Sequence, residues 1–193
     1  MYIIGGQFRR RKLAAPKGMN TRPTASRVRE ALFNVLQLYV EGARVLDLFS
    51  GSGALGLEAL SRGAESVTFV EKNTQAIQAL KENIADLQVE KQSSVIVSDV
   101  FKWIPHFQGE AFDLILADPP YESVVTPEVS SLATQLAYCI DQQPRFLKAD
   151  TQIFIEAGED LPDNASTHQR LVFKNQRHYG RCRIRHYVTV AGE

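Results

Sequence analysis

The sequence of 193 residues predicts an α/β protein built on a mainly parallel sheet. Short apolar runs rich in β-branched residues alternate with helical stretches between residues 44 and 156. One of these runs leads directly into a glycine-rich turn and then into a helix. The length suits one large domain, or one domain with an appendage. In sheets of this kind, ligands bind outside the carboxyl ends of the strands.

The stretch from Arg44 to Leu60 is the centre of this prediction. Its first residues form an apolar run typical of a buried strand, and its last residues have helical periodicity, which stops at Gly63. Between them, Gly51, Gly53 and Gly56 match the spacing of the dinucleotide-binding turn. Such a turn brings backbone N–H groups at a helix N-terminus close to a ligand. We therefore expect a ligand that carries adenosine.

Acidic residues at three strand ends favour S-adenosylmethionine as that ligand. Asp47 would repel a pyrophosphate held at the turn, whereas it suits a cationic amino-acid tail. Glu71 follows the strand 67–70 and would accept both ribose hydroxyls, and Asp99 would accept a hydrogen bond from the adenine amino group. Each acid alone could equally cap a helix. The predicted cofactor-contacting residues are Asp47, Phe49, Ser50, Gly51, Ser52, Gly53, Glu71, Lys72, Asp99 and Val100.

The remaining elements follow from the same patterns. Residues 2–15 are expected to form a small hairpin that bends near Gly5-Gly6 or the Arg9–Arg11 run. A helix capped by Thr24 should follow the loop 16–23, with Tyr39 last in its apolar stripe. We further expect helices from Asn73 to before Val89, over 101–104 and over 124–140, strands over 95–98, 112–117 and 152–156, and a final antiparallel pair over 171–173 and 182–188.

The net charge is zero, but it is unevenly distributed. Residues 1–30 carry a net charge of +7 and residues 170–193 a net charge of +5, so the middle carries −12. Two basic ends on an acidic body favour a nucleic-acid partner over charge that serves only solubility. Arg181, Arg183 and Arg185 alternate along the predicted last strand, where they form either a solvated face or an RNA contact.

The cysteine and hydropathy patterns indicate the cellular compartment in which the protein is expected. Cys139 and Cys182 make no metal-binding pattern with the four histidines, which suits a reducing cytoplasm and no metal. No apolar run approaches the length that spans a membrane.

Asp118-Pro119-Pro120-Tyr121 carries the predicted chemistry. The motif could be a simple turn, but consecutive prolines also fix carbonyl acceptors in space. An exocyclic base amine is a poor nucleophile. Hydrogen bonds from this amine to the Asp118 carboxylate and the Pro119 carbonyl would orient it and stabilise its developing positive charge. Tyr121 could stack on an extruded base. The motif alone leaves DNA, RNA and protein amides open as substrates.

These motifs together resemble the RsmD family of bacterial ribosomal RNA methyltransferases. The resemblance rests on four stretches, Thr21–Thr24, Arg27–Asn34, Leu46–Gly53 and Glu58–Ala64, with the Asp-Pro-Pro-Tyr motif after them. It implies a Rossmann-like class I methyltransferase fold, with seven strands, a reversed last strand and an N-terminal β-hairpin extension. We accordingly expect a basic arm over 1–22 and the methyltransferase domain over 23–193.

The resemblance also implies the substrate. The acceptor would be the N2 amine of a guanine in 16S ribosomal RNA, within an assembled small subunit, and we expect the protein to act as a monomer. Two alternatives stay open: an amino-methyltransferase of DNA or of another nucleic acid, and more remotely an NAD-binding oxidoreductase. The expected catalytic residues are Asp118, Pro119, Pro120 and Tyr121, and the expected RNA-binding residues are Arg9, Arg10, Arg11, Lys12, Arg22, Thr24 and Arg27.

Overall fold

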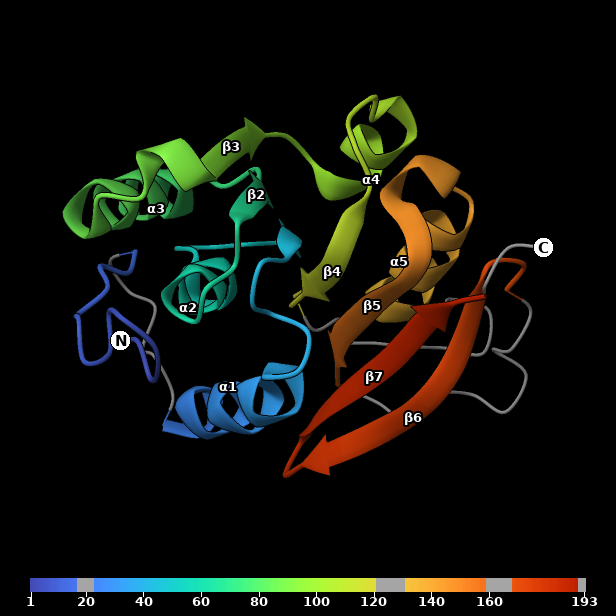
Figure 1. The fold of residues 1–193 in the computed structure, drawn as a ribbon, viewed down its shortest axis with the longest axis horizontal. Helices are drawn as coiled ribbons and strands as arrows, with labels where there is room; N and C mark the ends of the chain where they lie inside the picture. Colours follow the sequence, from blue (N-terminus) through green and yellow to red (C-terminus); the bar gives the residue numbers. More distant parts are fainter. Residues whose placement is uncertain (17–22, 121–130, 159–167, 191–193) are drawn as a thin grey trace.

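Seven strands form one mixed sheet, with helices on both of its faces (Figure 1). The computed structural model describes residues 1–16, 23–120, 131–158 and 168–190. The strands are β1 Arg44–Leu48, β2 Ser66–Glu71, β3 Ser93–Val97, β4 Phe112–Ala117, β5 Leu147–Ala157, β6 Leu171–Tyr179 and β7 Cys182–Thr189.

The strand order is β3-β2-β1-β4-β5-β7-β6. Strands β1 to β5 are parallel, whereas β7 runs antiparallel to both β5 and β6. The order reverses at β1, which has β2 on one side and β4 on the other, and such a point opens a crevice at the carboxyl ends of the strands. The predicted α/β class, the seven strands and the reversed last strand are confirmed.

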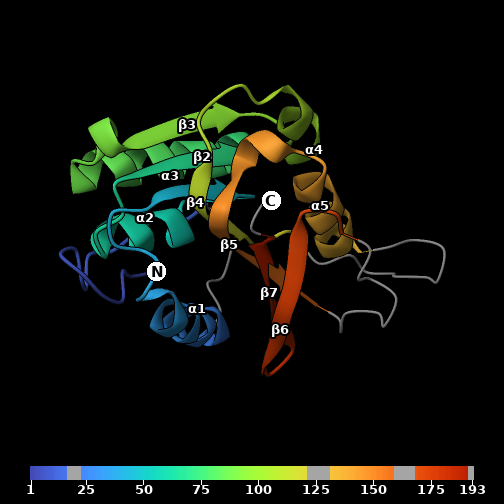
Figure 2. The same cartoon turned by 45° about the vertical axis from the view of Figure 1, so that its right-hand side comes forward.

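Two helical layers bury the two faces of this sheet (Figures 1 and 2). Helices α1 Pro23–Leu36, α2 Ala54–Ser61 and α3 Thr74–Leu87 pack on one face, and α4 Val100–Trp103 and α5 Leu132–Asp141 pack on the other. Side chains alternate along a strand, so in β1 Val45 packs with the first layer and Leu46 with the second. Burying each such side chain stabilises the fold by about 1.5–3 kcal/mol.

Two helices begin at side-chain caps. The Asn73 side chain accepts hydrogen bonds from the N–H groups of Gln75 and Ala76, so α3 begins where the sequence predicted. The Ser131 hydroxyl accepts from Thr134 N–H at 3.2 Å. The predicted helix over 124–140 is therefore wrong at Ser131, because Ser131 is the cap that precedes α5; residues 124–130 lie outside the described residues.

The first helix also differs from its prediction. Helix α1 begins at Pro23, whose fixed φ suits the first helical position, so the prediction that Thr24 is the N-cap is wrong. The helix ends at Leu36, and Tyr39 lies in the turn beyond it rather than in the helical stripe.

The N-terminal segment forms the predicted hairpin, although with little regular pairing. Tyr2 and Lys12 form one antiparallel bridge, and Leu13 N–H donates to the Met1 carbonyl at 2.9 Å. Ile3 and Leu13 are each 2% exposed and belong to the core that α1, α2 and α3 share. The hairpin is thus packed onto the main domain.

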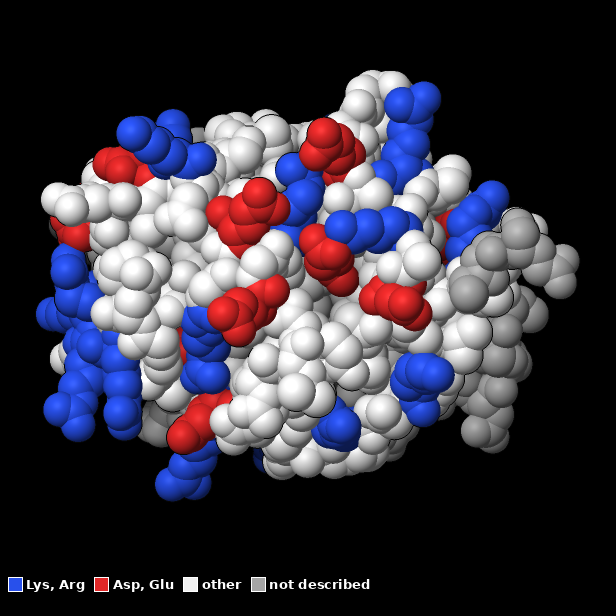
Figure 3. Space-filling model, in the orientation of Figure 1, with Lys and Arg blue, Asp and Glu red and all other residues white. Residues whose placement is uncertain are grey.

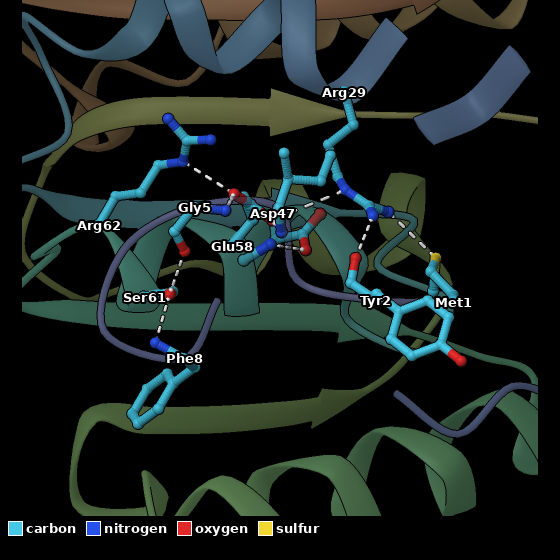
Figure 4. A network of polar contacts seen from close by, with 11 residues as sticks. Met1, Tyr2, Gly5, Phe8, Arg29, Asp47, Glu58, Ser61 and Arg62 are labelled. Carbon is cyan, nitrogen blue, oxygen red and sulfur yellow. Dashed lines mark hydrogen bonds and ion pairs between the residues drawn. The ribbon is translucent and has the colours of Figure 1, made fainter. Parts of the chain in front are cut away.

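The end of α2 holds this hairpin through a buried polar network (Figure 4). Glu58 is fully buried, and its carboxylate accepts the N–H groups of Ile4 and Gly5, each at 2.8 Å. Arg62 donates to the same carboxylate at 2.8 Å, and Arg29 lies 3.8 Å from it. Because burial of an unpaired carboxylate is very costly, these four partners are what allow Glu58 to lie inside the protein.

A second contact brings the two backbones together. Ser61 accepts a hydrogen bond from Phe8 N–H at 2.9 Å through its hydroxyl and from Gln7 N–H at 2.7 Å through its carbonyl. Gly6 has a φ of +74°, and a Cβ on it would lie 1.7 Å from the Ser61 carbonyl oxygen. Glycine is therefore required at this point of the hairpin.

Candidate active site

A cavity of about 640 Å³ opens at the carboxyl ends of the parallel strands. Its walls come from the loops after β1, β2, β3 and β4, from the carboxyl end of β5 and from the starts of the neighbouring helices, around the point where the strand order reverses at β1. Among the described residues the cavity is lined by Phe49, Gly51, Glu71, Lys72, Asn73, Ala76, Ser98, Asp99, Val100, Phe101, Asp118, Pro119, Pro120, Leu132 and Glu156. The volume lies in the range of small-molecule sites.

The turn after β1 follows the glycine pattern that the sequence predicted. Gly53 has a φ of +86°, and a Cβ there would lie 2.4 Å from Leu80. A Cβ on Gly56 would lie 2.3 Å from Phe69, so this glycine lets α2 pack closely on the sheet. Phe49 also has a positive φ, 58°, a strained conformation that is often found at functional sites.

Asp47 lies beneath this turn rather than in the cavity wall. It is 1% exposed, and its Oδ2 accepts the N–H of Gly56 at 2.8 Å. Burial raises the pKa of Asp47 to about 8, and the charges of Asp118 and Glu71 act in the same direction. The carboxyl group thus fixes the start of α2 and stands close to the other acids of the site. Ser50 and Ser52 are also buried.

Glu71 ties the end of β2 to the glycine turn. Its Oε2 accepts the N–H of Gly51, and its Oε1 accepts the N–H groups of Lys72 and Asn73, all at 2.8 Å. These backbone donors hold the carboxylate in one orientation against the cavity. Oε1 already accepts two N–H groups, whereas Oε2 accepts one and has a further lone pair, so Glu71 can still accept a hydrogen bond from a ligand through Oε2.

Asp99 closes the next wall, at the end of β3. Its Oδ1 accepts the N–H of Phe101 at the start of α4, and its Oδ2 accepts from the Lys72 ammonium at 2.8 Å. The hydrogen bond from Lys72 lowers the pKa of Asp99. Val100 lies beside it in the cavity wall. Asp99 therefore serves both as the N-cap that its sequence position allowed and as part of the cavity.

Asp118, Pro119 and Pro120 form the far edge of the cavity, at the end of β4. The Asp118 side chain is exposed to the cavity, but protein surrounds it on the other sides. This burial is the main cause that raises the pKa of Asp118 to about 7, and the charge of Glu156 is the second. Tyr121 lies outside the described residues.

Sequence reasoning missed part of this cavity. The sequence predicts Asn73, Phe101 and Leu132 only as helix residues, and Ser98 and Glu156 only as ends of strands, although all five line the cavity. A signal for Glu156 was present, since it is an acid at the end of an apolar parallel strand, as Glu71 is.

Those predicted RNA-binding residues whose side chains the structure describes do not line this cavity. Arg9, Arg10, Arg11, Lys12 and Arg27 are exposed, and the hairpin lies under a group of basic side chains on the left of Figure 3. The Arg11 guanidinium donates to the Asp86 carbonyl on α3 at 2.6 Å. Arg22 lies outside the described residues, as does the side chain of Thr24.

Neither reading of the last-strand arginines holds for Arg185. Its side chain is fully buried, and it donates to the hydroxyl of Thr134 on α5 at 3.0 Å. The prediction that the alternating arginines share one accessible face is therefore wrong at Arg185, because β7 lies between β5 and β6 and is covered by α5.

Comparison with known proteins gives the family. A family model described as Conserved hypothetical protein 95, which corresponds to the RsmD family, matches residues 1–188. The chain belongs to this family. The chain is also 36% identical to Ribosomal RNA small subunit methyltransferase D of Escherichia coli K12 over 171 residues, which cover 88% of this chain and 83% of that protein.

Solved structures agree with this assignment. The Escherichia coli protein yhhF is 32% identical and superposes with a TM-score of 0.81, covering 100% of this chain and 99% of its own. A hypothetical protein of Thermus thermophilus is 29% identical, with a TM-score of 0.78 over 98% of this chain and 99% of its own. The class I methyltransferase fold that the resemblance implied is thus confirmed. No helix among the described residues is long and apolar enough to cross a membrane.

Proposed function

We propose that this protein transfers the methyl group of S-adenosylmethionine to the N2 amine of a guanine in 16S ribosomal RNA, within an assembled small subunit. The observation that carries the proposal is one cavity in which Asp118, Pro119 and Pro120 face the acidic ends of β2 and β3. The reaction class and the RNA are supported by the name of the Escherichia coli relative.

The chemistry of the cavity wall suits S-adenosylmethionine better than a dinucleotide. Among its described lining residues Lys72 is the one lysine or arginine, and its ammonium pairs with Asp99. A pyrophosphate would lack a cationic partner here, whereas a sulfonium and an ammonium would be attracted to the carboxylates. Glu71 would hold the ribose through a hydroxyl that donates to its Oε2, Asp99 would hold the adenine amine, and the turn at Gly51 would hold the amino-acid tail.

When bound, S-adenosylmethionine supplies a methyl group on a sulfonium, and its transfer to nitrogen breaks the carbon–sulfur bond and yields S-adenosylhomocysteine. The chain's own residues then prepare the amine. The Asp118 carboxylate and the Pro119 carbonyl would accept its two N–H groups and stabilise the positive charge that develops on nitrogen. Asp118 can accept the proton that the nitrogen loses, because its pKa lies near 7. Orientation of this kind can account for several of the roughly 7–11 kcal/mol available to aligned reactants.

The test is to supply small subunits from a strain that lacks the enzyme, alongside the naked RNA, and to analyse digested nucleosides by mass spectrometry. We expect N2-methylguanosine, formed faster in the subunit, because a chain this short is expected to read shape and phosphate geometry. A different methylated nucleoside would refute the guanine assignment. Calorimetric titration with S-adenosylmethionine and NAD checks the cofactor independently, and binding of NAD alone would refute it.

A further inference from the structure

Glu156 lies at the carboxyl end of β5, one residue before its last residue, and is next to Asp118. Strands β4 and β5 are parallel, and Ala117 pairs with Ile155, so Asp118 and Glu156 follow at matched positions of the two strands. Neighbouring strands lie about 4.8 Å apart, and side chains at matched positions point to the same side of a sheet. Both residues line the cavity. Two carboxyl groups therefore stand side by side at the edge where the base would enter.

This arrangement is a row of acceptors. An ionised carboxylate accepts hydrogen bonds and donates none, and the Pro119 carbonyl is likewise an acceptor. Guanine presents a matching row of donors, namely the two N2–H groups and the neighbouring N1–H. Beside its exocyclic amine, adenine has the unprotonated N1 and cytosine the unprotonated N3, so each of these bases would turn a lone pair toward the second carboxylate.

We propose that Glu156 selects guanine by accepting its N1–H, while Asp118 and Pro119 accept the N2–H groups. The inference rests on the proposed methyl transfer to guanine N2, and it names the residue that chooses the base. A site built to bind a donor discriminates strongly against an analogue that lacks the donor, by about 10⁴–10⁵-fold in the strongest cases, because a buried partner is left unpaired.

Electrostatics supports the pairing. Burial is the main cause that raises the pKa of Asp118, and the adjacent charge of Glu156 is the second. Two neighbouring carboxylates repel each other, and donors placed between them relieve this repulsion. Adenine and cytosine offer only the two N–H groups of their amine, next to a ring nitrogen with a lone pair, so they relieve less of this repulsion. Guanine is thus the base whose binding the acidic pair favours most.

The test uses 2-aminopurine, which keeps the exocyclic amine at C2 but lacks the N1–H. Small subunits are reconstituted with 16S RNA that carries guanine or 2-aminopurine at the methylated position, and kcat/KM is measured for each. We expect the wild type to prefer guanine by at least about 100-fold. In Glu156→Gln the amide can donate as well as accept, so we expect this preference to fall by at least about tenfold.

Glu110→Gln is the matched control. Glu110 is 81% exposed and pairs with Arg44 outside the cavity, so its substitution should leave the preference unchanged. Equal wild-type rates on the two bases, or an unchanged preference in Glu156→Gln, would overturn the role of Glu156 and leave the proposed function standing. Loss of S-adenosylmethionine binding in Glu156→Gln would also overturn it, because the residue would then act on the cofactor. Methylation of neither base by the wild type would refute the proposed function itself.

Discussion

At the scale of single residues, the site concentrates carboxyl groups whose surroundings differ. Asp99 is paired with Lys72, and this contact lowers its pKa, whereas burial raises the pKa of Asp118 to about 7 and that of Asp47 to about 8. Groups with a raised pKa stabilise the folded protein at low pH, and this contribution is lost as the pH rises through 7 to 8. The protein therefore gives up some stability near neutral pH to keep acids at the site.

The first prediction concerns the ionisation of Asp118. Only the ionised carboxylate is purely an acceptor for the amine, so kcat at saturating RNA and cofactor should rise about tenfold from pH 6 to pH 8, as expected for a group with a pKa of about 7. Asp118→Asn should lose this pH step and most of the activity, at least about 100-fold, while it still binds S-adenosylmethionine. A flat wild-type profile over this range would contradict the assignment.

At the scale of elements, local patterns were enough for most of the parallel sheet. The apolar runs, the Gly51–Gly56 turn and the start of α3 near Asn73 each depend on neighbours in sequence, so the sequence alone predicts them. Glu156 and Arg185 were harder, because their roles depend on which strands lie next to one another. Only the order β4-β5-β7 brings Glu156 to Asp118 and places Arg185 under α5.

Helix α2 is the element that connects two parts of the molecule. Asp47 holds its beginning at the glycine turn, and Glu58 and Ser61 at its end hold the hairpin. A residue with no contact to the cavity can therefore decide where the basic hairpin lies.

The second prediction tests this contact. Glu58→Gln should destabilise the protein by about 3–5 kcal/mol. The amide has only one oxygen to accept hydrogen bonds, and it leaves Arg29 and Arg62 without the buried negative charge that they pair with. Denaturant unfolding measures the loss, and hydrogen exchange should show faster exchange at the Ile4 and Gly5 amides. Glu82→Gln, on the exposed face of α3, is the control and should change stability by less than about 0.5 kcal/mol. Protected Ile4 and Gly5 amides in Glu58→Gln would mean that the hairpin is held by its apolar contacts.

At the scale of the whole molecule, the charge is separated from the chemistry. The cavity is lined by acids, whereas residues 1–30 carry a net charge of +7 and their arginines and lysine at 9–12 are exposed. Phosphate contacts supply affinity and position without reading sequence. We therefore expect the hairpin to hold the RNA and the cavity to hold the base and the cofactor, with α2 fixing the hairpin to the domain.

The third prediction separates these two tasks. Replacing Arg9, Arg10 and Arg11 together with Gln should weaken RNA binding and flatten its log–log salt dependence by about two to three units, at a little under one unit for each phosphate contact. A change near two units would mean that Arg11 stays on the Asp86 carbonyl, and a change near three would mean that it turns to the RNA. S-adenosylmethionine affinity should stay the same, since none of the three lines the cavity.

The matched control replaces the exposed residues Lys81, Lys91 and Arg145 together with Gln. This variant loses the same charge from elsewhere on the surface, so the salt dependence of its RNA binding should keep the wild-type slope. If the hairpin variant kept the wild-type slope, its arginines would serve packing and solubility, and the RNA would have to be held by the other basic end of the chain.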